Sequence, residues 1–148
     1  MDLPGHVATV DALRARPFPA RDERRGAVDS GPGYHIADLR VSEDFWDVDG
    51  DHARRRQAEE DLEAECQALV EVFTERWGVP ETVDLTAHLE RLVEGEPVPG
   101  PLRTLCNYAH EAWAWRVDGR WIGVCVGQWD PELPFQLVAA VGDAAAVP

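Results

Sequence analysis

Residues 113–129 read W-A-W-R-V-D-G-R-W-I-G-V-C-V-G-Q-W, with apolar residues on both sides of the dipeptide Asp118-Gly119. An Asp-Gly pair between two such runs predicts a β-hairpin, because a type I′ turn needs positive φ angles at both central residues. If these two residues form the turn, Val117 lies opposite Arg120. The register of the remaining pairs then follows from the alternation of the two strands.

This register gives the hairpin a bulky face and a thin face. The bulky face carries Trp113, Trp115, Ile122, Val124 and Val126. The thin face carries Ala112, Ala114, Gly123, Cys125 and Gly127. Small residues on one face of a sheet indicate that something packs closely there or that the strands bend.

Other segments extend this hairpin into an α+β fold. Alternation of apolar and polar residues predicts an antiparallel sheet of about four strands, at 34–41, 111–117, 120–128 and 133–141. Apolar residues spaced three or four apart predict a long helix over 52–77, which packs on the sheet and ends at Gly78. Its apolar stripe is Ala58, Leu62, Cys66, Leu69, Phe73 and Trp77. A shorter helix is expected at about 86–94, and a further short strand at 81–85 stays open.

The ends of the chain have a different composition from the middle. Residues 1–33 are rich in Gly, Pro and charged residues, and only 7–13 are apolar enough for a turn of helix or a short strand. We interpret 1–33 as an extended or partly disordered arm. A single α+β domain follows over 34–142, and 143–148 is expected to form a frayed tail. A chain of 148 residues is of ordinary size for one domain.

The charge of the chain is strongly negative, at −14, and no lysine is present. The missing lysine excludes a P-loop and Schiff-base chemistry. Residues 1–40 hold equal numbers of acids and arginines, so the remainder carries the whole net charge. Because such a surface repels phosphate backbones and anionic membranes, we expect no direct nucleic-acid or membrane contact. The expected partner is another protein, and a basic one.

The sequence lacks the patterns of a membrane span, a signal peptide and a redox-active or metal-binding cysteine pair. No apolar run approaches the ~18 residues of a membrane span, and the first residues do not resemble a signal peptide, so we expect a cytoplasmic protein. The three cysteines, Cys66, Cys106 and Cys125, have no C-x-x-C spacing and are interpreted as reduced core thiols.

Residues 42–51 form an acidic loop that reads S-E-D-F-W-D-V-D-G-D. In a binder of a basic partner, carboxylates attract the partner and exposed aromatic side chains anchor it. The candidate binding residues are chosen on this basis. These are Asp44, Phe45, Trp46, Asp47 and Asp49, together with Trp129 after the hairpin. An EF-hand loop with Gly50 at its sixth position would have to start at Phe45 and end at Arg56, neither of which suits calcium.

Metal and cofactor binding are not predicted. Asp47, Asp49 and Asp51 are only weak candidates for a carboxylate cation site, since Asp51 also suits the N-cap of the long helix. The histidines show no zinc spacing, and neither serine lies in G-x-S-x-G. His110 and Glu111 are adjacent, and adjacent strand residues point to opposite faces, which argues against an acid–base pair.

The sequence therefore favours a small, acidic, non-catalytic protein-interaction module, such as an immunity-like, antitoxin-like or inhibitory binder of a basic partner. One alternative is a metal- or small-ligand-dependent enzyme that uses the 44–51 carboxylate loop, with His35 or His110 as the base. Another alternative is a structural subunit that forms a homodimer through a sheet edge.

Overall fold

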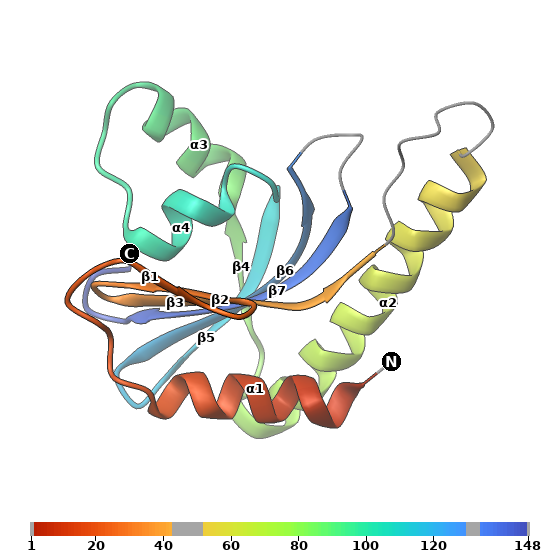
Figure 1. Ribbon diagram of the computed structural model, residues 1–148, viewed down its shortest axis with the longest axis horizontal. Helices are drawn as coiled ribbons and strands as arrows, with labels where there is room; N and C mark the ends of the chain where they lie inside the picture. The colour runs from red at the N-terminus through yellow and green to blue at the C-terminus, as the bar shows by residue number, and fades with distance from the viewer. Residues whose placement is uncertain (1, 43–51, 130–133, 148) are drawn as a thin grey trace.

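The computed structural model describes residues 2–42, 52–129 and 134–147, which fold into one antiparallel sheet between two helical layers (Figure 1). Along the described chain, the strands are β1 (Glu23–Arg25), β2 (Val28–Gly31), β3 (Tyr34–Val41), β4 (Glu81–Asp84), β5 (Glu111–Val117), β6 (Arg120–Gln128) and β7 (Phe135–Asp143). Their order across the sheet is β1-β2-β3-β7-β6-β5-β4, and each neighbouring pair is antiparallel.

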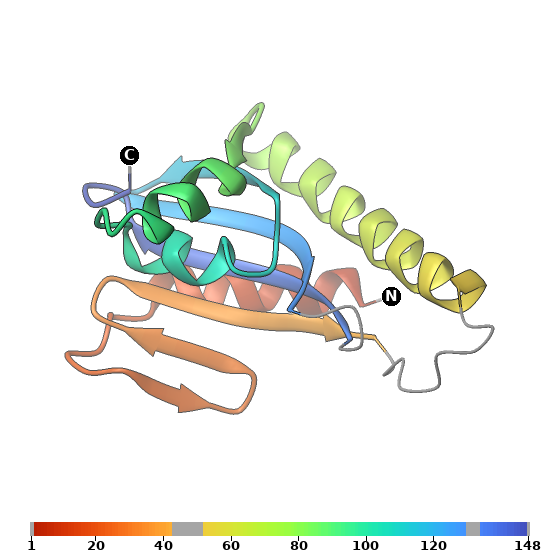
Figure 2. The ribbon, with the colours of Figure 1, turned by 90° about the horizontal axis from the view of Figure 1, so that it is seen from above.

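The helices lie on both sides of this sheet. They are α1 (Leu3–Ala15), α2 (His52–Trp77), α3 (Leu85–Val93) and α4 (Gly100–Leu105). Helices α1 and α2 lie on one side of the sheet, and α3 and α4 lie on the other (Figure 1). Figure 2 shows that the β1–β2 hairpin extends the sheet at one edge.

The prediction of about four strands is wrong, because the described residues form seven strands and four helices. All four expected strands are present, and β1, β2 and β4 lengthen the sheet at its two edges. The first of these is three exposed residues, Glu23–Arg25, so it shows no alternation between an inner and an outer face. Strands this short are fixed by their neighbours in the sheet and not by a pattern of their own.

The hairpin register is confirmed. Asp118 and Gly119 both have positive φ, at 52° and 79°, and Val117 pairs with Arg120. The pairing continues through Trp115 opposite Ile122. The turn residues therefore predict the register of the β5–β6 pair correctly.

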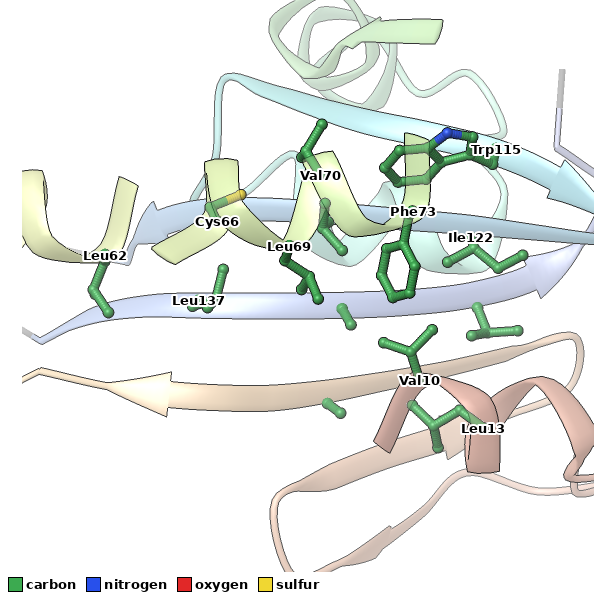
Figure 3. Packing of buried hydrophobic residues seen from close by; sticks show 14 of the residues in the cluster. Val10, Leu13, Leu62, Cys66, Leu69, Val70, Phe73, Trp115, Ile122 and Leu137 are labelled. Atoms are coloured by element: carbon green, nitrogen blue, oxygen red, sulfur yellow. The ribbon is translucent and has the colours of Figure 1, made fainter. Parts of the chain in front are cut away.

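The bulky face of the hairpin forms one core with α1 and α2. Figure 3 shows side chains of α2, including Leu69 and Phe73, meeting Val10 and Leu13 of α1 over the strands. Each of these four side chains is at most 1 % exposed. The predicted apolar stripe of α2 faces this core along its whole length, with its two end residues partly buried.

The thin face of the hairpin is covered by large aromatic side chains and by α3 and α4. The Trp121 indole lies across Gly123, and a Cβ atom at Gly123 would overlap the ring. Tyr108, which follows α4, lies across Gly127 in the same way. Close packing on the thin face, one of the two expectations, is thus confirmed, and the glycines are needed because they leave room for these rings.

Residues 1–33 contain regular structure in place of an extended arm. The Asp2 side chain caps α1 by accepting a hydrogen bond from the Gly5 amide at 3.1 Å, and a proline stands in the first turn. Helix α1 buries Val10 and Leu13, and the strands β1 and β2 follow it. The core and the sheet therefore begin well before residue 34. At the other end, Val147 is buried and the Ala144 amide donates to the Gly119 carbonyl, although a frayed tail was expected.

A buried ion cluster joins α1, α2 and β3. The Glu65 side chain is fully buried, and its two oxygens accept from His6 Nε2 at 2.9 Å and Arg40 at 2.7 Å. Burial alone would raise the pKa of Glu65, but the hydrogen bonds and charges of Arg40 and His6 outweigh it and hold that pKa below its usual value. Glu65 is thus ionised and fixes α2 against the sheet and α1.

The depressed pKa of Glu65 predicts a loss of stability in acid. A carboxyl with a lower pKa in the folded state adds stability that is complete above its unfolded pKa of about 4.3 and disappears as the pH falls through the folded value. Urea unfolding should therefore show the gap in stability between the wild type and Glu65→Gln constant from about pH 7 to about pH 5 and shrinking below that, as the pH falls past about 4.3 toward the lower folded pKa. A gap that stays constant below about pH 5 as well would contradict the ionised cluster.

No helix in the described parts of the chain is both long enough and apolar enough to cross a membrane.

Candidate functional site

A groove of about 640 Å³ lies between α2 and the edge of the sheet formed by β4, β5 and β6. We call it the acidic groove. Its lining residues are Glu63, Cys66, Gln67, Thr82, Asp84, His110, Glu111, Trp113 and Val126. Helix and strand periodicity explain why these residues meet. Glu63 and Gln67 are one turn apart on α2, while Thr82 and Asp84 are two apart on β4 and so share a face.

Three carboxylates from different elements converge on this groove. Asp84 and Glu111 are directly opposite each other across β4 and β5, a pairing of like charges that costs stability. The pKa of Glu63 is raised by its partial burial and by the negative charges of Glu59, Glu60 and Glu111. The groove is therefore a region of concentrated negative potential.

Among the described residues, two of the groove carboxylates, Glu63 and Glu111, form no ion pair. Across residues 2–42, 52–129 and 134–147, no arginine or histidine lies within ion-pair distance of Glu59, Glu63 or Glu111. Asp84 accepts a hydrogen bond from the Ala87 amide at 3.2 Å, so it also caps α3. The negative charge of Glu63 and Glu111 is thus left for solvent or for a ligand.

A second cavity of about 230 Å³ continues the acidic groove. It shares Glu63, His110 and Val126 with the groove and adds Glu59 from the preceding turn of α2. Tyr108 and Phe135 give this part an aromatic wall. The negative surface therefore extends along α2 toward the ends of β6 and β7.

His110 and Glu111 line the same groove, contrary to the expectation that they face apart. His110 lies in a bend immediately before β5, so the alternation of a regular strand does not apply to it. His110 is the candidate base that lies on a cavity. The described geometry brings no nucleophile or third polar group into contact with it, and it supports no particular reaction.

Trp129 is exposed beside this site. Its side chain is 49 % exposed, and its ring stacks on Tyr108 with the centroids 4.5 Å apart. Because Tyr108 also lines the second cavity, Trp129 stands next to the continuation of the acidic groove. Its role as an aromatic anchor stays a prediction.

The other predicted binding residues lie in a part of the chain that the structure does not describe. These are Asp44, Phe45, Trp46, Asp47 and Asp49, together with the weak cation ligand Asp51. Their proposed roles therefore stay predictions. In the ranges that are described, no group of three or more His, Cys, Asp or Glu side chains could hold a metal ion.

His35, the other candidate base, is a structural residue. It is fully buried, with Nδ1 2.6 Å from Ser30 Oγ and Nε2 3.2 Å from the Arg16 carbonyl. A carbonyl can only accept, so Nε2 carries the proton and Nδ1 accepts from the serine hydroxyl. Burial lowers the pKa of His35, which keeps the ring neutral. The hydrogen bond from His35 to the Arg16 carbonyl fixes the segment after α1 to the sheet. The buried His35 ring cannot be reached by a substrate.

The cysteines are free and buried, as expected. Cys66 lines the acidic groove, but burial raises the pKa of its thiol to about 12. Burial likewise raises the pKa of Cys106 and of Cys125. A protonated thiol is a poor nucleophile, so none of the three suits thiolate chemistry.

The acidic groove was not found from the sequence. No motif or spacing in the sequence marks Glu59, Glu63 or Asp84 as members of one site. Glu63 follows the core residue Leu62, so it lies at the border of the apolar stripe, which was the available hint. Its meeting with Glu111 depends on the angle at which α2 crosses the sheet, which no local pattern contains.

Comparison of the chain with protein-family models, with curated proteins and with solved structures found no match.

Proposed function

We propose that this protein is a non-catalytic binder of a basic protein, of the immunity-like or inhibitory type, and that it holds its partner in the acidic groove. The observation that carries the proposal is the convergence of Glu63, Asp84 and Glu111 on one groove, where partial burial and then the acidic neighbours raise the pKa of Glu63. Like charges held together without a cation cost stability, and a partner's arginine or lysine side chains relieve that cost.

Binding begins with long-range attraction. The net charge of −14 accelerates encounter with a basic surface, and this acceleration weakens as salt screens the charges. Partner cations then enter the acidic groove, and Trp129 contributes apolar area beside it. The groove is large enough for one or two extended basic side chains, and the energy comes from charge complementarity together with burial of the indole.

The double variant Glu63→Gln/Glu111→Gln tests this proposal. Each substitution keeps the shape of the side chain and removes its charge. The tagged wild type and the variant are used to capture proteins from the native lysate, and the association rate of the captured partner is measured at low and high salt. We expect the variant to associate about tenfold more slowly at low salt and to have a weaker salt dependence.

The matched control is Glu90→Gln/Glu94→Gln, at two exposed positions on and after α3 that lie outside the groove. It changes the net charge by the same amount, so it isolates the effect of position. Equal losses in both variants would mean that only total charge matters, and the acidic groove would not be the binding site. A partner whose capture is insensitive to salt and to the groove variant would overturn the proposal.

A further inference from the structure

Strand β4 is an edge of the sheet with one unpaired side. It is the last strand in the sheet order and pairs only with β5 among the residues that the structure describes. Three of its four residues are exposed. An edge of this kind offers backbone donors and acceptors to another extended segment, which can add to the sheet as a further strand.

The pairing of β4 determines which backbone groups face outward. The Leu85 amide donates to the His110 carbonyl at 2.9 Å, and Val83 lies opposite Ala112. In an antiparallel pair the residues that bond to the neighbour alternate with residues that point away. Val83 therefore bonds to β5, and the N–H and C=O of Thr82 point to the open side.

Thr82 connects this edge to the acidic groove, because its backbone faces the open side and its side chain lines the groove. The side chains of Thr82 and Asp84 share the face of β4 that lines the groove, whereas Val83 packs on the opposite face with the core under α3. A strand added beside β4 would have alternate side chains on the groove face, next to Thr82 and Asp84 and within reach of long side chains directed toward Glu111 on β5. Arginine or lysine at those alternate positions would meet the carboxylates, and apolar residues between them would extend the surface around Val83.

We infer that the partner's recognition element is an extended basic segment that adds to β4 as an eighth strand and places alternate cationic side chains in the acidic groove. This inference rests on the proposed function and names the form of the partner at that site. Addition of a second copy of β4 is opposed by charge, because it would bring a second Asp84 to the edge beside the carboxylates that already line the groove. The edge is therefore suited to a basic strand.

Thr82→Pro tests the inference, because proline removes the outward N–H and leaves every carboxylate in place. Proline is tolerated on an edge strand where the amide faces solvent, so the variant should fold with a thermal midpoint close to that of the wild type. The probe is a blocked nine-residue peptide of alternating arginine and valine, titrated by calorimetry at low salt. We expect Thr82→Pro to bind it about tenfold more weakly, and Thr82→Val, which keeps the amide, to bind it as the wild type does.

A second probe removes the same backbone hydrogen bonds by changing the peptide and not the protein. It is the same peptide with methylated backbone nitrogens, which keeps the charge but cannot pair as a strand. We expect it to bind the wild type as weakly as the unmodified peptide binds Thr82→Pro, with no further loss when the two changes are combined. Slower hydrogen exchange of the Thr82 amide in the peptide complex provides a direct readout.

The outcomes separate this inference from the proposed function. If Thr82→Pro binds the peptide as the wild type does while Glu63→Gln/Glu111→Gln loses affinity, the groove binds cations without strand addition and the inference is overturned. If only Thr82→Pro loses affinity, the edge is used but the acidic groove is not, and the proposed function fails. No binding of the peptide, or a concentration-dependent mass of the free protein that Thr82→Pro abolishes, would also overturn the inference.

Discussion

Glu65→Ala should lower the free energy of unfolding by about 3 kcal/mol, the lower end of the range for breaking a buried ion pair. The Glu65 carboxylate is fully buried and accepts from both His6 and Arg40. Its removal leaves the largely buried His6 ring without its acceptor and opens a small cavity. The cost stays at the lower end because the Arg40 side chain is 43 % exposed and can be hydrated again.

Urea unfolding at neutral pH measures this effect, with the midpoint and the slope compared between variants. The matched control is Glu63→Ala, two residues earlier on the same helix, where the side chain is exposed and has acidic neighbours. We expect that control to change stability by less than about 0.5 kcal/mol. Similar losses at both positions would show that the charge of α2 matters and that the buried cluster does not.

Trp121→Ala should lower the free energy of unfolding by about 3–5 kcal/mol, as expected for a fully buried tryptophan. The Trp121 side chain has no exposed surface and fills the space above Gly123 on the thin face of the hairpin. Gly123, two residues along the same strand, and Gly142, opposite Trp121 on β7, have no side chains that could move into the cavity. The loss therefore includes both the transfer of the indole and the cavity that it leaves.

The same substitution at Trp129 provides the comparison. Trp129 is 49 % exposed, so its truncation removes only the stacking on Tyr108 and should cost about 1 kcal/mol. Thermal unfolding followed by tryptophan fluorescence and circular dichroism measures both variants. If Trp129→Ala were as destabilising as Trp121→Ala, Trp129 would be a core residue and could not serve as an exposed anchor.

Short-range chemistry explains what could be predicted. Asp118-Gly119 determined the hairpin, because the backbone conformation of a two-residue turn depends on those residues alone. The helix at 52–77 was found because its apolar stripe is long and regular. Helix α1 was missed although Asp2 and a proline in its first turn are start signals, because the many Gly, Pro and charged residues of 1–33 were given more weight.

The sheet edges were only partly predictable. The short strand left open at 81–85 is present as β4, whereas β1 has three exposed residues, too few for a pattern, and is held by pairing with β2. Arg24 of β1, for example, pairs with Asp29 of β2. Pairing partners distant in sequence are invisible to a reading of local periodicity.

The sequence by itself determined the net charge, the hairpin register and the face of α2 that enters the core, because each depends on composition or on spacing within one element. Only the tertiary structure decided which acids act together. Glu63, Asp84 and Glu111 come from a helix and two strands, and they meet because α2 packs across β5, β6 and β7 and leaves a groove between itself and the β4 edge. Glu65, two residues from Glu63, points to the core and pairs with His6 and Arg40. Identical side chains thus have opposite roles, because burial and neighbouring charge, which the packing of the elements sets, determine the energy of a carboxylate.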